Sequence, residues 1–171
     1  MTKRLLAGGL LAAAFLATGV EAGDRSGDWR FDVYLDDRPI GEHRFAVDHQ
    51  GERLRVESTA DFQVDFLFLT AFRYDHRAVE EWEGDCLARL EARTEKNGKA
   101  LQVEGHRVAG GFLVERPDGE EALLPDCRAT FAYWDPAILQ RDRLINSQNG
   151  AHVDVTARAL GTETIQVGER S

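Results

Sequence analysis

The sequence predicts an all-β protein built on a single curved antiparallel sheet, a half-barrel or open barrel-like structure, with one short helix near residues 136–144. Two observations lead to this prediction. Apolar and polar residues alternate with a period of two along several stretches, which is typical of strands with one buried face. Turn signals rich in Gly, Pro, Asn and Asp recur roughly every 8–12 residues, as they do in all-β sandwiches and barrels.

The first residues predict export. Lys3 and Arg4 precede an uncharged apolar run over residues 5–20, and small residues follow at the positions that a signal peptidase recognises. This run is shorter than the about 20 residues that a membrane-spanning helix needs. We therefore expect a Sec-type signal peptide over residues 1–22, cleaved after Ala22, and a periplasmic or secreted protein with no transmembrane segment once the signal is removed.

Residues 23–171 have the length of one β domain. Lys3, Arg4 and Glu21 leave with the signal, so 19 basic and 29 acidic residues remain, a net charge of −10. An acidic surface repels nucleic acid and anionic lipid. We therefore expect no nucleic-acid partner.

Two cysteines, Cys86 and Cys127, predict one disulfide, because paired cysteines in an exported protein form bridges. The bridge closes a loop of about 40 residues, which stabilises a fold by about 4 kcal/mol on the chain-entropy description. The alternatives are two free thiols or a reactive cysteine. No Cys-x-x-Cys motif and no adjacent His or Lys favours them.

The chain begins with a predicted hairpin. Trp29, Phe31, Val33 and Leu35 share one face of the first strand. After a turn at residues 36–39, the chain returns over residues 41–48, with His43 on the same face as Phe45 and Val47.

The longest alternation covers residues 58–82, which would extend for about 80 Å as one strand, whereas a domain of this size is about 40 Å across. The chain must therefore reverse, and residues 67–71 are the expected place because both faces become apolar there. No Gly, Pro or Asn marks a tight turn. The segment either lies against the core at the end of the sheet or forms an apolar lip at a cavity or a patch for a partner.

Further strands are predicted over residues 87–94, 101–108 and 112–116, the first two joined by an Asn-Gly hairpin signal. Asp135 as N-cap and Pro136 at the first helical position predict the start of the short helix. A last hairpin is expected over residues 153–159 and 164–167.

The search for chemistry finds no metalloprotease, serine-hydrolase, phosphate-binding or EF-hand motif. We therefore predict no catalytic residue, no metal ligand and no cofactor, and a non-enzymatic role is favoured while an enzyme stays open. His43 and His76 are the candidate functional polar residues, because each shares a face with apolar neighbours. A lone histidine in that position is more often a hydrogen-bonded core residue than a ligand or base.

Two further clusters have competing interpretations. Glu80, Glu81, Glu83 and Asp85 flank Trp82, and we expect a solvated edge there, because a calcium site needs six or more convergent oxygens. The aromatic residues of segment 131–134 either plug one end of the sheet beside the disulfide or form a shelf that faces a ligand.

Several motifs resemble a known family. The most specific are Cys-x-x-x-Phe-Ala-Tyr-Trp-Asp-Pro at residues 127–136 and Leu-Ile-Asn-x-Gln-x-Gly at residues 144–150. Weaker matches lie at residues 31–36, 39–41, 74–77 and 85–87. Together they resemble exported bacterial proteins of the domain of unknown function 6134.

The resemblance implies a curved antiparallel sheet like that of other periplasmic half-barrel proteins, and it implies no catalytic role. Similar members continue with a strand pair rich in Trp, Tyr and Asp. We therefore expect this chain to be a truncated or divergent version.

The leading hypothesis is an exported β-protein with a binding or envelope-structural role, whose partner is an apolar small molecule or lipid, or an envelope protein. An apolar ligand would lie on the concave face of the sheet. The expected ligand-lining residues are Phe45, Phe62, Phe66, Tyr74, Trp82, Tyr133 and Trp134. The alternatives are a hydrolase with a site built from His43, His76 and nearby carboxylates, and an interaction module that uses an open sheet edge.

Overall fold

The structure, a computed structural model, describes residues 26–164, apart from the side chains of Gln50 and Phe66. The predicted signal peptide and the C-terminal residues 165–171 lie outside the described residues. Within residues 26–164, no helix has the length and apolar character needed to span a membrane.

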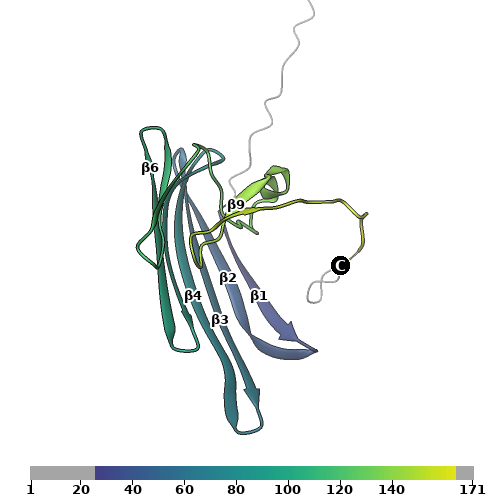
Figure 1. Cartoon of the computed structure of the whole chain (residues 1–171). Helices are drawn as coiled ribbons and strands as arrows, with labels where there is room; N and C mark the ends of the chain where they lie inside the picture. The colour runs from purple at the N-terminus through teal and green to yellow at the C-terminus, as the bar shows by residue number, and fades with distance from the viewer. Residues whose placement is uncertain (1–25, 165–171) are drawn as a thin grey trace, which may run out of the picture.

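Eight strands form one antiparallel sheet in which each strand pairs with the next one along the chain. The sheet is curved and does not close, so β1 and β8 are its two edges in the described part of the chain (Figure 1). The all-β prediction is confirmed, and the main sheet is antiparallel and open, but β9 (Arg143–Ile145) and β10 (His152–Asp154) form a second, two-stranded sheet that was not predicted. The strands are β1 (Gly27–Leu35), β2 (Arg38–Gln50), β3 (Arg53–Phe66), β4 (Leu69–Glu83), β5 (Cys86–Lys96), β6 (Lys99–Val108), β7 (Gly111–Glu115) and β8 (Glu121–Leu124).

The chain after β8 crosses the concave face of the sheet (Figure 1). This covering segment, residues 125–155, contains the short 3-10 helix η1 (Pro136–Gln140) and the strand pair β9 (Arg143–Ile145) and β10 (His152–Asp154). Its buried apolar side chains pack on those of the sheet and complete the hydrophobic core. Buried members of this core include Val56, Ala78, Leu87, Leu90, Val103, Phe112 and Val114 from the sheet, with Ala129, Ala132, Leu144 and Ile145 from the covering segment.

A disulfide between Cys86 and Cys127 ties the covering segment to the start of β5, which confirms the predicted bridge. Backbone hydrogen bonds reinforce the attachment: the Leu87 amide donates to the Arg128 carbonyl at 2.8 Å, and the Ile145 amide donates to the Ala129 carbonyl at 2.8 Å. The Arg141 guanidinium also donates to the Asp85 carbonyl at 2.7 Å. The segment is thus held at its beginning and across its middle.

The predicted helix near residues 136–144 is only partly right. Asp135 caps it as expected, accepting a hydrogen bond from the Ala137 amide at 3.0 Å, but the helix is a single 3-10 element that ends at Gln140. Residues 143–145 cannot continue it, because their backbone pairs with β10 and Leu144 and Ile145 are buried in the core.

The predicted last hairpin is wrong where the structure describes it. Val153 pairs with Leu144 of β9 rather than with a later strand, and residues 155–164 form no regular element. Residues 165–167 lie outside the described part of the chain.

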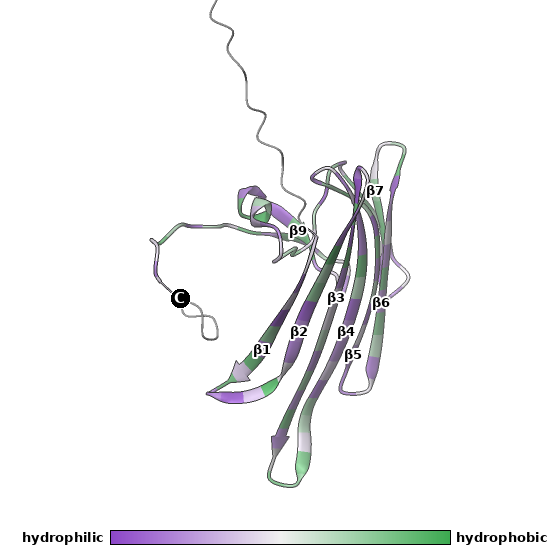
Figure 2. Ribbon diagram, turned by 180° about the vertical axis from the view of Figure 1, so that it is seen from behind, coloured by the Kyte–Doolittle hydropathy of each residue, from purple (hydrophilic) through white to green (hydrophobic). Residues whose placement is uncertain are grey.

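The β3–β4 hairpin reverses at residues 67–68, inside the stretch expected to turn, and Leu69 begins β4. Leu67 turns the chain in the left-handed region, with φ of 56°, which is unusual for a branched side chain. The side chains of Leu67, Phe68 and Leu69 are 79%, 98% and 76% exposed, so the interpretation that they pack on the core is wrong. Figure 2 shows this hydrophobic end of the hairpin extending beyond the neighbouring strands.

The first strand is also more exposed than its alternation suggested. Trp29, Phe31 and Leu35 share one face, yet all three are exposed. The reason is positional: β1 is an edge strand that contacts a neighbour, β2, on one side only. That edge remains available to the predicted interaction role, which stays a prediction.

We expect the Cys86→Ser/Cys127→Ser double variant to lose about 4 kcal/mol of unfolding free energy, because the unfolded chain regains the entropy of a loop of 41 residues. Urea unfolding followed by tryptophan fluorescence measures this loss. Wild-type protein treated with a reductant is the matched control and should unfold at the same urea concentration as the variant. Equal stability of the variant and the oxidised wild type would contradict the anchoring role.

Candidate functional site

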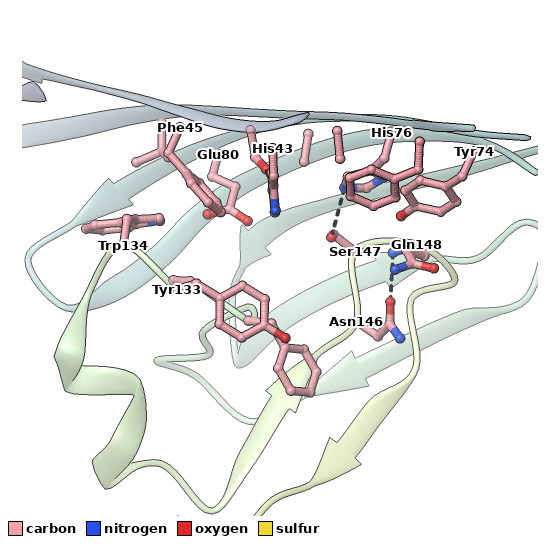
Figure 3. Close-up of a pocket in the computed structure, with 17 residues that line it drawn as sticks. His43, Phe45, Tyr74, His76, Glu80, Tyr133, Trp134, Asn146, Ser147 and Gln148 are labelled. Carbon is pink, nitrogen blue, oxygen red and sulfur yellow. Dashed lines mark hydrogen bonds between the residues drawn. The ribbon is translucent and has the colours of Figure 1, made fainter. Parts of the chain in front are cut away.

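A cavity of about 260 Å³ lies between the concave face of the sheet and the covering segment (Figure 3). Strands β2, β3 and β4 form one wall, and residues 131–134 and 146–148 form the other. For comparison, an engineered apolar cavity of about 150 Å³ is large enough to hold benzene. The space therefore suits a small organic molecule.

The strand register explains why space remains here. One row across the sheet runs from His43 through Ala60 to His76, and the next row runs from Phe45 through Ser58 to Ala78. Alternate residues of a strand point to the same side, so both rows face the covering segment. The small side chains of Ser58 and Ala60 lie at the centre of these rows, and the small Ala78 ends the second row. The cavity occupies the volume that the small side chains leave unfilled.

Aromatic side chains line much of the cavity. Of the seven residues expected to line a ligand site, the structure places Phe45, Phe62, Tyr74, Tyr133 and Trp134 on its walls. Phe62 and Tyr74 stack with 5.4 Å between ring centroids, and Tyr133, which is 68% exposed, lies at the rim.

The other two expected residues are placed differently. Trp82 is only 3% exposed and packs edge-on against Trp134 in the core, with 5.6 Å between ring centroids, rather than lining the cavity. The side chain of Phe66 lies outside the described part of the structure. Trp134 of the aromatic segment both packs on the core and lines the cavity, and its role as a shelf that faces a ligand stays a prediction.

Both candidate histidines line the cavity, and each has a hydroxyl partner. The Nε2 atom of His43 lies 2.9 Å from Ser58 Oγ. The Nδ1 atom of His76 lies 2.8 Å from Thr94 Oγ1, and its Nε2 atom lies 3.4 Å from Ser147 Oγ.

Burial lowers the pKa of both imidazoles. For His76 the pKa falls to about 4, first because of burial and then because His43 is nearby. The pKa of His43 is also lowered by burial. Both rings are therefore neutral at pH 7.

The position of Glu80 differs most from the prediction. The acidic cluster was expected to be solvated, but Glu80 is only 6% exposed and lines the cavity. Its Oε2 atom accepts a hydrogen bond of 3.0 Å from the Trp82 indole. By contrast, Glu81 and Glu83 point to the other face and lie beside Arg55 and Arg53, as expected of a solvated edge.

Burial raises the pKa of Glu80 to about 7. The hydrogen bond from Trp82 opposes this rise. The Thr130 hydroxyl also lies close enough to lower the pKa, although its geometry falls short of a hydrogen bond. A sequence signal for Glu80 did exist, because Glu80 has the same parity as His76, Ala78 and Trp82, which are inward-facing residues of β4.

The loop between β9 and β10 supplies polar groups that the sequence did not identify as part of the site. Asn146, Ser147 and Gln148 line the cavity. Asn146 shapes this loop, since its side-chain oxygen accepts from the Gln148 amide at 2.9 Å and its carbonyl accepts from the Gly150 amide at 2.8 Å. Gly150 has φ of 71° and lies against Arg116 and Val114, where a side chain would clash. The turn therefore directs Ser147 toward His76.

In the part of the chain that the structure describes, no group of three or more His, Cys, Asp or Glu side chains is arranged to hold a metal ion.

In a comparison with known families, the profile of a domain of unknown function (DUF6134) matches residues 31–171. No curated protein and no solved structure matches the chain.

His76 and Glu80, the two titratable groups of the cavity with large pKa shifts, should change the stability of the fold in opposite directions as the pH changes. His76, with its pKa lowered from 6.5 to about 4, stabilises the fold fully above pH 6.5 and loses that contribution as the pH falls toward 4. Glu80, with its pKa raised from 4.5 to about 7, acts in the opposite sense, so stability falls as the pH rises from 4.5 to 7. In the wild type the two effects oppose each other between about pH 4.5 and 6.5.

Single variants should reveal each effect. As the pH rises from 4.5 to 7, the unfolding free energy of Glu80→Gln should increase relative to that of the wild type. As the pH falls from 6.5 to 4.5, the unfolding free energy of His76→Asn should decrease less than that of the wild type. Each difference should be on the order of 3 kcal/mol. Urea unfolding at half-unit pH intervals measures it. Parallel pH profiles for the variants and the wild type would show that neither group is perturbed by burial.

Proposed function

This chain belongs to the family of the domain of unknown function DUF6134, and we propose that it is an exported binding protein that holds one small, largely apolar ligand between the sheet and the covering segment. The proposal follows from the cavity, because the family description names no activity. The disulfide supports the exported location, since such bridges persist in oxidising compartments.

The observation that carries the proposal is unfilled space between the sheet and the covering segment, which opens to the surface at the rim formed by Tyr133. Protein interiors normally leave few voids larger than a water molecule. A cavity of about 260 Å³ corresponds to roughly nine waters at the volume of liquid water. Its walls combine aromatic faces with a few polar groups, which is the usual composition of small-molecule sites.

The anchoring of the covering segment also supports a binding role. The disulfide and the Leu87–Arg128 hydrogen bond hold the wall formed by residues 131–134 near the sheet before any ligand arrives. A site that is already formed needs little ordering when it binds, and this favours affinity.

A second candidate is a hydrolase, favoured by the contact between Ser147 and His76. Serine hydrolases use a histidine to activate a serine hydroxyl, and a carboxylate then stabilises the charged imidazole. Here the other side of His76 meets the Thr94 hydroxyl instead of a carboxylate. A histidine with a pKa of about 4 is also a weak base at neutral pH. Both features favour binding over catalysis.

The binding proposal is tested by filling the cavity. Ala60→Leu adds a side chain at the centre of the cavity wall and should abolish ligand binding while the protein still folds. Thr59→Leu is the matched control, because Thr59 is adjacent on β3 and points to the opposite face. Native mass spectrometry of protein purified without denaturant from an envelope extract should detect a bound small molecule in the wild type and in Thr59→Leu only.

The outcome that would overturn the proposal is equally specific. If no protein carries a ligand and Ala60→Leu raises the melting temperature, the cavity is a dry void that a larger side chain fills.

Reaction with a fluorophosphonate probe distinguishes the hydrolase. Such probes label serines that a neighbouring base activates. We expect no labelling of the wild type and the same result for Ser147→Ala. Labelling that is present in the wild type and lost in Ser147→Ala would establish a nucleophilic serine and favour the hydrolase.

A further inference from the structure

We propose that the ligand of this cavity is a small organic cation, an amine or a quaternary ammonium compound, whose charge lies beside Glu80 within an aromatic enclosure of Phe45, Tyr133 and Trp134. This inference rests on the proposed binding function and specifies its ligand class. It differs from the purely apolar ligand that the sequence suggested.

Glu80 occupies the position that a cation would need. Figure 3 shows its carboxyl group extending from β4 into the cavity, between Phe45 and His43, with Tyr133 on the opposite wall and Trp134 beyond Phe45. Its Oε2 atom is engaged by the Trp82 indole. Trp82 in turn packs edge-on against Trp134, so the carboxyl group and one aromatic wall are held by the same residue.

The charge inside the cavity has one sign. Among the described residues that line it there is no Lys, Arg or Asp, and Glu80 is the one carboxyl group. His43 and His76 do not balance it, because burial lowers the pKa of both and keeps them neutral. When Glu80 ionises, the cavity therefore holds a negative charge without a positive partner from its own walls.

A buried carboxylate without a positive partner is unfavourable, and a ligand that brings the missing charge removes the penalty. The surrounding aromatic faces favour the same ligand, since the negative face of an aromatic ring attracts a cation most strongly when water is excluded. The net charge of −9 for the whole chain also raises the local concentration of cations.

A metal ion is a poorer occupant than an organic cation. Hard metals need several oxygen ligands, and the described residues bring no third metal-binding side chain to Glu80. The size fits an organic molecule: scaled from benzene in a cavity of about 150 Å³, the space accepts on the order of ten non-hydrogen atoms.

Matched pairs of cations and neutral isosteres test the charge directly. The pairs are choline with 3,3-dimethylbutan-1-ol, benzylamine with benzyl alcohol, and butylamine with butanol. Isothermal titration calorimetry of the wild type should show at least one cation binding about tenfold or more tightly than its neutral partner. In Glu80→Gln, which keeps an acceptor for the Trp82 indole, that preference should disappear and the neutral partner should bind as before.

Two further variants test the enclosure. Tyr133→Leu should weaken binding of the cation by roughly threefold, because one aromatic face is lost. Tyr34→Leu is the control, since Tyr34 lies exposed on the edge strand β1 and does not line the cavity, so this variant should bind the cation as the wild type does.

The outcomes separate this inference from the proposed function. Equal binding of cations and neutral isosteres, or a preference that survives Glu80→Gln, overturns the cationic ligand but leaves a binding cavity. Absence of binding by all six compounds overturns the cationic ligand as well. If, in addition, no ligand co-purifies with the protein, the proposed binding function fails too.

Discussion

The structure depends on the covering of an open, curved sheet. An unclosed sheet of this kind has a concave apolar face that the sheet itself cannot bury, so another part of the chain must lie across it. Residues 125–155 meet this need, and the Cys86–Cys127 bridge with the Leu87–Arg128 hydrogen bond sets where they cross. The core and the cavity both lie between the sheet and the covering segment. Where large side chains from the two meet, they form the core, and where the sheet carries the small side chains of Ser58 and Ala60, the space left unfilled is the cavity.

Much of the sheet could be predicted because strand alternation is a local property. The parity of Phe62, Tyr74 and His76 placed them on one face, and the cysteine count identified the disulfide. The chain after Asp135 could not be predicted in the same way, since Leu144 and Ile145 join β9 through contacts with β10 and Ala129. The apolar character of residues 67–69 also led to the wrong expectation that they pack on the core. Hydropathy measures how favourable burial of a side chain would be, but it does not tell whether another surface is available to bury it.

In the site too, the direction of a side chain could be predicted from local alternation, whereas its burial and its neighbours depend on tertiary packing. Alternation along β4 predicts that Glu80 and Trp82 point the same way, but the chemical preference of glutamate for water argued for a solvated edge. Tertiary packing decided the outcome, because the covering segment buries that face regardless of which residues it carries. Ser147 shows the limit more clearly: it lies 71 residues from His76 in the sequence, and its proximity depends on a turn shaped by Asn146 and Gly150. The volume of the cavity likewise depends on which side chains oppose each other across two layers.

The meander order of the sheet has a consequence for kinetics. Each strand pairs with its neighbour in sequence, so hairpins can form from local contacts, which are the contacts that speed folding. The covering segment can close only after a surface exists for it to cross, so one wall of the cavity forms early and the other forms late. The proposed ligand, bound between these two walls, would stabilise a contact that the early sheet lacks. Its occupancy should therefore slow unfolding far more than it accelerates folding, and its residence time should follow the rate at which the covering segment opens.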